Sequence, residues 1–325
     1  MSFLPVVLAL AMWAGCARGA PPPAEFARIG GHDYVRLADW AKGHNLELRW
    51  LKPEESLQLS NHSARILLTV DHREAQISGI EVWLLFPAVL HNGSVYLAQL
   101  DLQTTLQPLL SPPRNQPGLR IKTVCLDPGH GGKDPGNRVG PNQEKQYTLL
   151  LAQEVGQQLV RAGLKVFFTR STDTFVELPT RPEVAKRRGA DLLLSLHFNS
   201  ADASRDSVQG AEVYCLTPAG ASSTNGRGEG GGGGPCPGNR CNEKNLLLAY
   251  QLQKAVTRNL GSEDRGVRRA RFAVLRDAVM PATLIEAGFM SHPAEGRRIF
   301  SSAYRQKLAR AIVEGVLAYK RQVEM

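Results

Sequence analysis

The sequence predicts an α/β protein whose main domain is preceded by a small α+β domain. From Leu119 onward, strand-like apolar runs alternate with long amphipathic segments, which is typical of an α/β domain. Residues 24–110 instead alternate short apolar runs with Gly, Asn and Asp, a pattern that favours short strands with one or two helices. The 325 residues are enough for two domains with a sizeable core.

The first 20 residues, MSFLPVVLALAMWAGCARGA, predict a signal peptide without a basic n-region. Their apolar stretch is too short for a stable membrane-spanning helix, and no later stretch is long and apolar enough for one. A second interpretation is a lipoprotein, because WAGC resembles the end of a lipoprotein signal with Cys16 as the acylated residue. We favour simple export to the periplasm or the cell wall, where disulfides persist.

Residues 24–110 predict a small binding domain. The segments YVRLADWAK, LRWL and FPAVLHNGSVYLAQLDL resemble the small wall-associated domain at the N-terminus of copper amine oxidases. Five of the eight histidines lie here without ligand-like spacing, so we interpret them as core or surface residues: His32, His44, His62, His72 and His91. The segment SPPRNQPG, residues 111–118, predicts a linker that its prolines stiffen, and hence an independent module.

The sequence of the main domain, residues 119–325, predicts alternating strands and helices. The predicted strands are residues 121–126, 165–169, 191–196, 211–216 and 282–286. The predicted helices are residues 144–163, residues 242–261 and a last helix from about Ser302. Apolar residues recur at every fourth position of each helix, and Gly163 and Gly261 are natural stops for the first two.

A glycine-rich insertion interrupts this alternation at residues 218–242. Its run of five glycines cannot hold a fixed backbone without a large entropic cost, so we predict a mobile surface loop. Cys236 and Cys241 flank PGNR and are candidates for a small disulfide, whereas Cys125 and Cys215 are expected to be buried thiols.

The formal net charge of +9 predicts an anionic partner. Export argues against nucleic acid and favours the cell wall, which carries carboxylates and often phosphates. Basic residues are spread along the chain except in RGVRRARF, residues 265–272, which we interpret as a solvated face. We expect the protein to be a monomer.

Three predicted strands each end in a residue that can do chemistry. His130 follows the first in the loop DPGHGGKDPG, His197 ends the third, and Glu286 ends the last. Sites in open α/β sheets form beyond the carboxyl ends of the strands, so these residues converge if the strands are parallel neighbours. Glu144 begins a helix fourteen residues after His130, and the intervening loop is long enough to return its carboxylate to that histidine.

Two imidazoles, one carboxylate and an open position are typical of a catalytic zinc site. Zinc lowers the pKa of a bound water and polarises a scissile carbonyl. The second carboxylate could then act as general base. The spacing alone does not decide which of Glu144 and Glu286 is the ligand and which is the base.

Four motifs in this order resemble the zinc-dependent N-acetylmuramoyl-L-alanine amidases of the type 3 group. They are DPGHGGKDPG, EK before a helix, the segment ending SLHFNS, and LIEAGFMSHP, within about residues 122–317. The resemblance implies a mainly parallel twisted sheet with helices on both faces, metal ligands His130, Glu144 and His197, and catalytic Glu286. It also implies hydrolysis of the amide that joins N-acetylmuramic acid to the L-alanine of the peptidoglycan stem peptide.

Other polar residues near these motifs have less specific roles. We interpret Asp127 and Asp134 as turn carboxylates and His292 as a turn residue, and we regard Asn199 and Arg276 as candidates for contact with substrate. Two alternatives remain for the whole protein. One is a zinc peptidase of related fold, against which Lys133 counts because a His-x-x-Glu ligand pair would need glutamate there, and the other is a cell-wall-binding protein without activity.

Overall fold

The structure is a computed structural model that describes residues 25–201, 206–224 and 233–325. The predicted signal peptide, with the acylation candidate Cys16, lies outside these residues, as do positions 225–232 of the glycine-rich insertion. Among the helices of the described ranges, none combines the length and the apolar character needed to cross a membrane.

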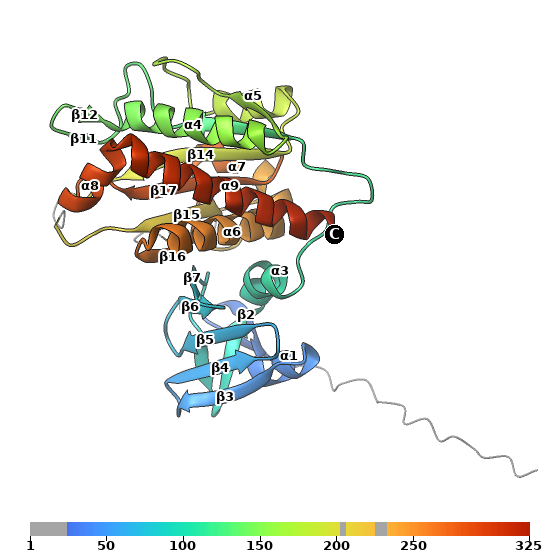
Figure 1. The fold of residues 1–325 in the computed structure, drawn as a ribbon. Helices are drawn as coiled ribbons and strands as arrows, with labels where there is room; N and C mark the ends of the chain where they lie inside the picture. Colours follow the sequence, from blue (N-terminus) through green and yellow to red (C-terminus); the bar gives the residue numbers. More distant parts are fainter. Residues whose placement is uncertain (1–24, 202–205, 225–232) are drawn as a thin grey trace, which may run out of the picture.

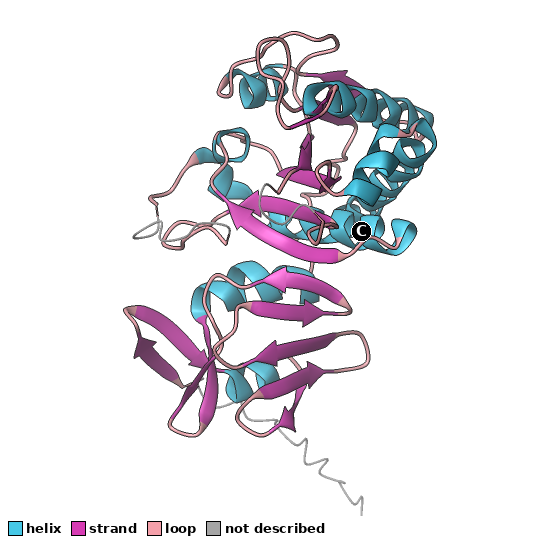
Figure 2. Ribbon diagram, turned by 90° about the vertical axis from the view of Figure 1, so that its left-hand side faces the viewer, coloured by secondary structure: helices cyan, strands magenta, loops and turns pink. Residues whose placement is uncertain are grey.

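The main domain is a mixed sheet with helices on both faces (Figures 1 and 2). Its strand order is β13 (Lys165–Phe168), β10 (Thr123–Pro128), β14 (Leu192–Asn199), β17 (Ala282–Phe289), β15 (Ala211–Leu216) and β16 (Asp264–Ala270). The first four strands are parallel, and β15 and β16 run in the opposite direction to them. The predicted α/β fold is therefore confirmed, although the sheet is mixed and parallel only in its first four strands.

The three long amphipathic helices cover one face of this sheet. They are α4 (Glu144–Arg161), α6 (Asn242–Leu260) and α9 (Ser302–Glu324), as the fourfold spacing of apolar residues predicts. Their buried side chains form one core with apolar residues of β14, such as Leu194 and Phe198. Shorter helices that the sequence analysis did not predict complete the domain: α5 (Thr180–Arg187), α7 (Ala273–Arg276) and α8 (Pro293–Phe300). Helices α5 and α7 lie on the opposite face, where the loops and side chains of the site also lie.

Residues 25–110 form a unit made mostly of strands. One sheet contains β1 (Phe26–Ile29), β2 (His32–Arg36), β9 (Ser94–Ala98) and β8 (Val89–His91). The remaining strands form an antiparallel run that belongs to the larger, 11-stranded sheet: β3 (Glu47–Lys52), β4 (Ser56–Ser60), β5 (Arg65–Thr69), β6 (Glu74–Ile77) and β7 (Ile80–Trp83). Helix α1 (Leu37–Gly43) and a last helical stretch, α2 (Gln99–Asp101) to α3 (Gln107–Leu110), accompany them.

The two units share one sheet. Strand β7 pairs in parallel with β16 at Val82 and Val267, so the sheet of the main domain continues into the N-terminal unit. Hydrogen bonds cross the same boundary: Glu81 N to Asp264 (2.9 Å), Tyr250 Oη to the Ile77 carbonyl (3.0 Å), and Arg269 to the Thr104 carbonyl (2.7 Å). The expectation of an independent module is therefore wrong in this respect, because β7 covers what would otherwise be an exposed edge strand.

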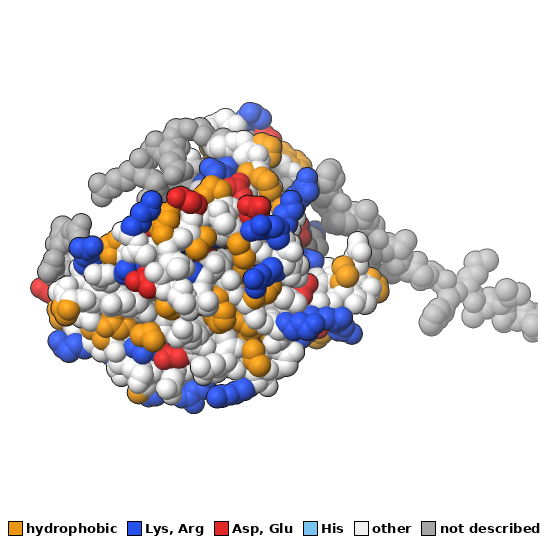
Figure 3. All heavy atoms as spheres, turned by 90° about the horizontal axis from the view of Figure 1, so that it is seen from above, with side chains coloured by type: hydrophobic (Ala, Val, Ile, Leu, Met, Phe, Trp, Pro, Cys, Tyr) orange, Lys and Arg blue, Asp and Glu red, His pale blue; other side chains and the backbone are white. Residues whose placement is uncertain are grey.

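The basic run 265–272 lies largely within strand β16, so its interpretation as a solvated face is wrong. Arg269 is fully buried, and Arg265 and Arg268 form ion pairs with the buried Glu212. Elsewhere, basic side chains are scattered among acidic and apolar ones on the face that Figure 3 shows. Within the described ranges, Cys236 and Cys241 are free thiols and do not form the predicted disulfide, and Cys125 and Cys215 are buried thiols as expected.

Candidate metal centre

Three neighbouring parallel strands bring the chemical side chains to one edge of the sheet. Strands β10, β14 and β17 are adjacent, and each runs toward the same edge. His130 lies in the loop just beyond β10, His197 lies near the end of β14, and Glu286 pairs with His197 in the register of β17. The convergence requires both the order and the direction of these strands, and the structure provides both.

The glycines of the loop after β10 allow the backbone to approach the site closely. A Cβ atom on Gly129 would lie 2.2 Å from the His197 ring, and one on Gly136 would lie 2.6 Å from a carboxylate oxygen of Glu144. His130 itself has a φ of 60°, a left-handed conformation that is costly for a residue other than glycine. The loop therefore holds His130 in a strained backbone conformation against its partners.

Two buried arginines hold the backbone of this loop. Arg170 donates to the carbonyls of Pro128 (3.0 Å) and Gly129 (2.7 Å). Arg181 donates to the His130 carbonyl (2.9 Å) and forms an ion pair with Asp127 (2.8 Å). Asp127 is thus a fully buried anchor at the end of β10, and its interpretation as a turn carboxylate is wrong. Charge-assisted hydrogen bonds of this kind fix the loop that carries His130.

Glu144 is the centre of the cluster. It begins helix α4 and is buried, yet its carboxylate lies 3.0 Å from His130 Nε2 and 3.0 Å from His197 Nδ1. The backbone and side-chain amides of Asn137 and the backbone N–H of Phe198 also donate to it. Burial alone would raise the pKa of Glu144, but the hydrogen bonds from the two histidines outweigh burial and lower that pKa strongly. The carboxylate is therefore held ionised.

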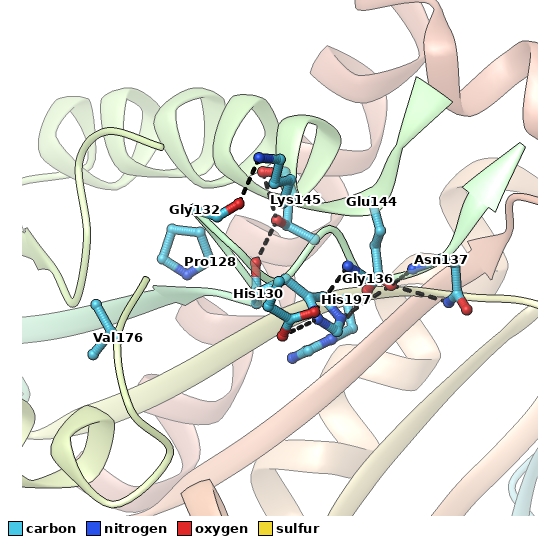
Figure 4. A network of polar contacts seen from close by, with 12 residues as sticks. Pro128, His130, Gly132, Gly136, Asn137, Glu144, Lys145, Val176 and His197 are labelled. Atoms are coloured by element: carbon cyan, nitrogen blue, oxygen red, sulfur yellow. Dashed lines mark hydrogen bonds and ion pairs between the residues drawn. The ribbon is translucent and has the colours of Figure 1, made fainter. Parts of the chain in front are cut away.

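His130 is oriented by a second carboxylate. Its Nδ1 lies 2.8 Å from Asp134 Oδ2, which leaves Nε2 directed toward Glu144 (Figure 4). Burial acts to lower the pKa of His130, but the hydrogen bonds with Glu144 and Asp134 outweigh burial and raise it. Asp134 is a turn residue, as expected, since it also pairs with Gly131, and in addition it fixes the ring of His130.

The cluster His130, Glu144 and His197 fits a divalent metal ion. One ligand atom from each residue lies within 4.8 Å of those of the other two. Figure 4 shows the side chains of His130, His197 and Glu144 directed toward one another, with Asn137 beside the glutamate. Two imidazole nitrogens and one carboxylate oxygen form a donor set that suits zinc and leaves further coordination positions free.

The cluster opens into a cleft with a volume of about 530 Å³. One wall of the cleft is the segment 175–178 before α5, and the other is the segment 272–274 at the start of α7. Both walls present apolar side chains, among them Phe175 and Phe272, so the polar groups gather at the floor. Such a cleft suits a substrate that has apolar faces and a single reacting polar bond.

Glu286 lies on the floor of this cleft. Its Oε2 is buried and finds no hydrogen-bond donor among the described residues. Burial, together with the charges of Glu144 and Glu212, raises the pKa of Glu286 well above its usual value. A strongly perturbed carboxyl beside a metal-ligand cluster is typical of a group that transfers protons.

The other candidate residues lie at or beyond the margin of the cleft. Asn199 donates to Glu212 (2.9 Å), and Arg276 lies on the surface beside Asp277, so neither lines the cleft. His292 accepts a hydrogen bond from the Glu295 N–H at the start of α8, which makes it a helix cap. The described residues of the glycine-rich insertion do not line the cleft either.

Several residues that support the site were not predicted from the sequence. Asn137 binds Glu144, Glu212 is the cross-strand partner of Glu286, and Arg170 and Arg181 hold the loop that carries His130. Only Asn137 and Asp134 carried a local signal, because polar residues recur within the loop that delivers His130. The other three act across strands that are distant in the sequence.

Comparisons with known proteins agree with the fold and with the predicted family. The profile of the Amidase_3 family, described as N-acetylmuramoyl-L-alanine amidase, matches residues 124–318. The chain is 37% identical over 246 residues to the N-acetylmuramoyl-L-alanine amidase AmiC of Neisseria meningitidis, a match that covers 68% of this chain and 57% of that protein. It is 34% identical over 222 residues to AmiA of Escherichia coli, covering 61% of this chain and 76% of AmiA. The chain thus spans little more than half the length of the meningococcal relative.

Two solved structures share the fold of the main domain. The amidase AmiC2 of Nostoc punctiforme is 33% identical with a TM-score of 0.52, over 63% of this chain and 99% of that chain. An N-acetylmuramoyl-L-alanine amidase from Clostridium difficile is 30% identical with a TM-score of 0.51, over 62% of this chain and 97% of that chain.

Proposed function

We propose that this chain, which belongs to the Amidase_3 family of N-acetylmuramoyl-L-alanine amidases, hydrolyses the amide bond between N-acetylmuramic acid and the L-alanine of the peptidoglycan stem peptide. The observation that carries the proposal is the cluster of His130, Glu144 and His197 at the floor of a cleft, with Glu286 in register beside His197. A metal-ligand set and a separate proton-transfer group are what amide hydrolysis requires.

The metal we propose is zinc, held by His130, Glu144 and His197. When bound, zinc lowers the pKa of a water and polarises the scissile carbonyl. The carboxylate of Glu144 is already ionised, and Asp134 aligns the ring of His130. Little rearrangement of these side chains is therefore needed to bind the metal. Asn137 keeps the glutamate in place through two hydrogen bonds of 3.0 Å.

Glu286 is the proposed general base and acid. It takes a proton from the attacking water as the oxygen joins the lactyl carbonyl carbon. It then gives a proton to the nitrogen of L-alanine as the carbon–nitrogen bond breaks, so that protons balance over the reaction. Its raised pKa and its free carboxylate oxygen support this role, because a group that exchanges protons near neutral pH needs a pKa above that of an ordinary glutamate.

We propose that the protein is exported and acts in the periplasm or at the cell wall. Its N-terminal unit is then the part that binds the wall. The names of two staphylococcal relatives, probable cell wall amidases LytH, support this setting. Processing as a lipoprotein at Cys16 and a monomeric state remain predictions. The apolar walls of the cleft would contact the sugar ring and the lactyl group, while the floor holds the amide.

Digestion of purified peptidoglycan by the full-length mature protein tests the proposal. We expect release of stem peptides that begin with a free L-alanine amine, loss of the activity after treatment with a chelator, and recovery on adding zinc. Cleavage inside the stem peptide would favour the zinc peptidase instead. Binding to the wall without cleavage by zinc-loaded protein would favour a non-enzymatic wall-binding protein.

A further inference from the structure

We propose that Glu212 is a positioning residue that keeps two arginines away from Glu286 and so leaves the catalytic carboxylate free to face the cleft. The inference rests on the proposed role of Glu286, and it concerns residues that lie behind the cleft and outside the metal cluster. It also extends the site toward the N-terminal unit, because one of the two arginines contacts that unit.

A row of side chains crosses neighbouring strands on one face of the sheet. His197 in β14 pairs with Glu286 in β17, and Glu286 pairs with Glu212 in β15. Residues that pair in register direct their side chains to the same face. The two glutamates are therefore direct cross-strand neighbours, an arrangement that is unfavourable for two like charges unless one of them is compensated.

The negative charge of Glu212 is compensated by two arginines and two hydrogen-bond donors. Glu212 is only 3% exposed, and its Oε2 lies 3.1 Å from Arg265 Nε and 3.0 Å from Arg268 Nε. Its Oε1 accepts hydrogen bonds from Asn199 (2.9 Å) and Tyr214 (2.8 Å). With four donors, the carboxylate of Glu212 is fixed in position.

Within the part of the chain that the structure describes, Glu286 lacks a partner of this kind at one of its two carboxylate oxygens. Its Oε2 lacks a donor among the described residues, although two guanidinium groups lie just beyond its cross-strand neighbour. Arg265 already reaches strand β17, since its guanidinium carbon lies 4.9 Å from the ring centroid of Phe289, three residues after Glu286. Without a negative charge at Glu212, Glu286 is the adjacent carboxylate on this face of the sheet, and we expect the arginines to turn toward it, because an uncompensated buried charge is costly. An ion pair there would tie up the proton-transfer group.

The N-terminal unit contributes to this arrangement. The guanidinium of Arg268 lies 4.3 Å from the ring centroid of Trp83, which ends strand β7. The tryptophan thus covers Arg268 from the far side while Glu212 binds it from the near side. Through the contact between Trp83 and Arg268, strand β7 supports the site in addition to covering the edge of β16.

The substitution E212Q tests the inference because it removes the charge and keeps the shape. We expect kcat to fall about tenfold or more, because the released arginines pair with Glu286, while KM and the zinc content stay close to those of the wild type. The triple substitution E212Q/R265Q/R268Q removes the competing cations as well and should recover most of the lost kcat. A residue needed only for folding would not show such recovery.

The matched control is E154Q, which breaks another glutamate–arginine pair, with Arg305, on the helical face of the sheet. This variant should keep the wild-type kcat. Unchanged kcat in E212Q would overturn the inference, as would a triple variant at least as impaired as E212Q. If E212Q does not retain zinc, the triple variant decides: near wild-type kcat supports the inference, and kcat as low as that of E286Q overturns it.

E286Q separates this inference from the proposed function. Should zinc-loaded E286Q remain fully active, the proposed role of Glu286 fails. Should E286Q be inactive while E212Q is fully active, only the role of Glu212 fails.

Discussion

His197 and Glu286 lie directly opposite each other in the register of the parallel strands β14 and β17. The pairing places a metal-ligand candidate and a proton-transfer candidate on the same face, one strand apart, about 4.8 Å in the hydrogen-bonding direction. Neither residue needs a long flexible loop to reach the other. The floor of the cleft is therefore built on rigid strands, and only His130 and Glu144 depend on the loop after β10.

Removal of one imidazole should remove the metal. In H197A, we expect zinc content and amidase activity to be lost together, because a three-ligand site with one ligand missing binds metal far more weakly. Metal analysis of the purified variant measures this. H292A is the control, since His292 caps α8 away from the cluster and its loss should leave zinc in place. Full zinc occupancy in H197A would contradict the ligand assignment.

Neutralising the proposed base should separate metal binding from turnover. E286Q is nearly isosteric, so we expect normal zinc content and a kcat lower by about a hundredfold or more. Turnover of a soluble muropeptide by the zinc-loaded variant gives the result, and E243Q, at an exposed position of α6, serves as control. Near-native hydrolysis by zinc-loaded E286Q would rule out the role.

Asp134 should tune the affinity for metal without being a ligand. D134N weakens the hydrogen bond to His130 Nδ1, and loss of such a partner typically lowers metal affinity about 10- to 100-fold. Competition with a zinc chelator measures the affinity directly. The control D173N alters a carboxylate that binds Lys145 and Gly132 in the same region but does not touch a ligand. Equal affinities of D134N and D173N would show that Asp134 does not orient His130.

The N-terminal unit should support both wall binding and stability. A chain that begins at Pro117 keeps the cluster and should still bind zinc and cleave soluble muropeptides. It exposes the edge of β16, so we expect a Tm lower by about 5 °C or more, and weaker binding to intact wall. A chain that begins at Glu25 is the control. Equal Tm and equal wall binding for the two chains would contradict the prediction.

The glycine-rich insertion should not inhibit the enzyme. Its composition disfavours a helix that could plug the cleft, since each glycine costs roughly 1 kcal/mol relative to alanine. Replacing residues 225–232 by a short linker keeps Thr224 and Gly233, which bond to strand β16 and to Arg271. We expect activity without any activator, and a change within about twofold on replacement. A large gain in activity would show that the insertion inhibits.

Local patterns in the sequence predicted the elements of the main domain well. The fourfold spacing in α4, α6 and α9 and the apolar runs of β10, β14 and β17 are strong signals because each depends on residues close in the chain. Strand β16 was missed because it carries four charged residues, Asp264, Arg265, Arg268 and Arg269, and charges normally indicate a solvated segment. Their ion pairs with residues of other elements reverse that expectation.

The sequence by itself determined which residues can do chemistry, because a histidine in a glycine loop, a histidine at a strand end and two glutamates are visible as residue types at particular positions. It also determined the family resemblance. Only the tertiary structure decided that Asp134 aligns His130 and that Glu212 forms ion pairs with Arg265 and Arg268. It also decided that the N-terminal unit shares the sheet of the main domain. These relationships are contacts between strands, loops and helices far apart in the chain, and they depend on strand order and register, which no local pattern encodes.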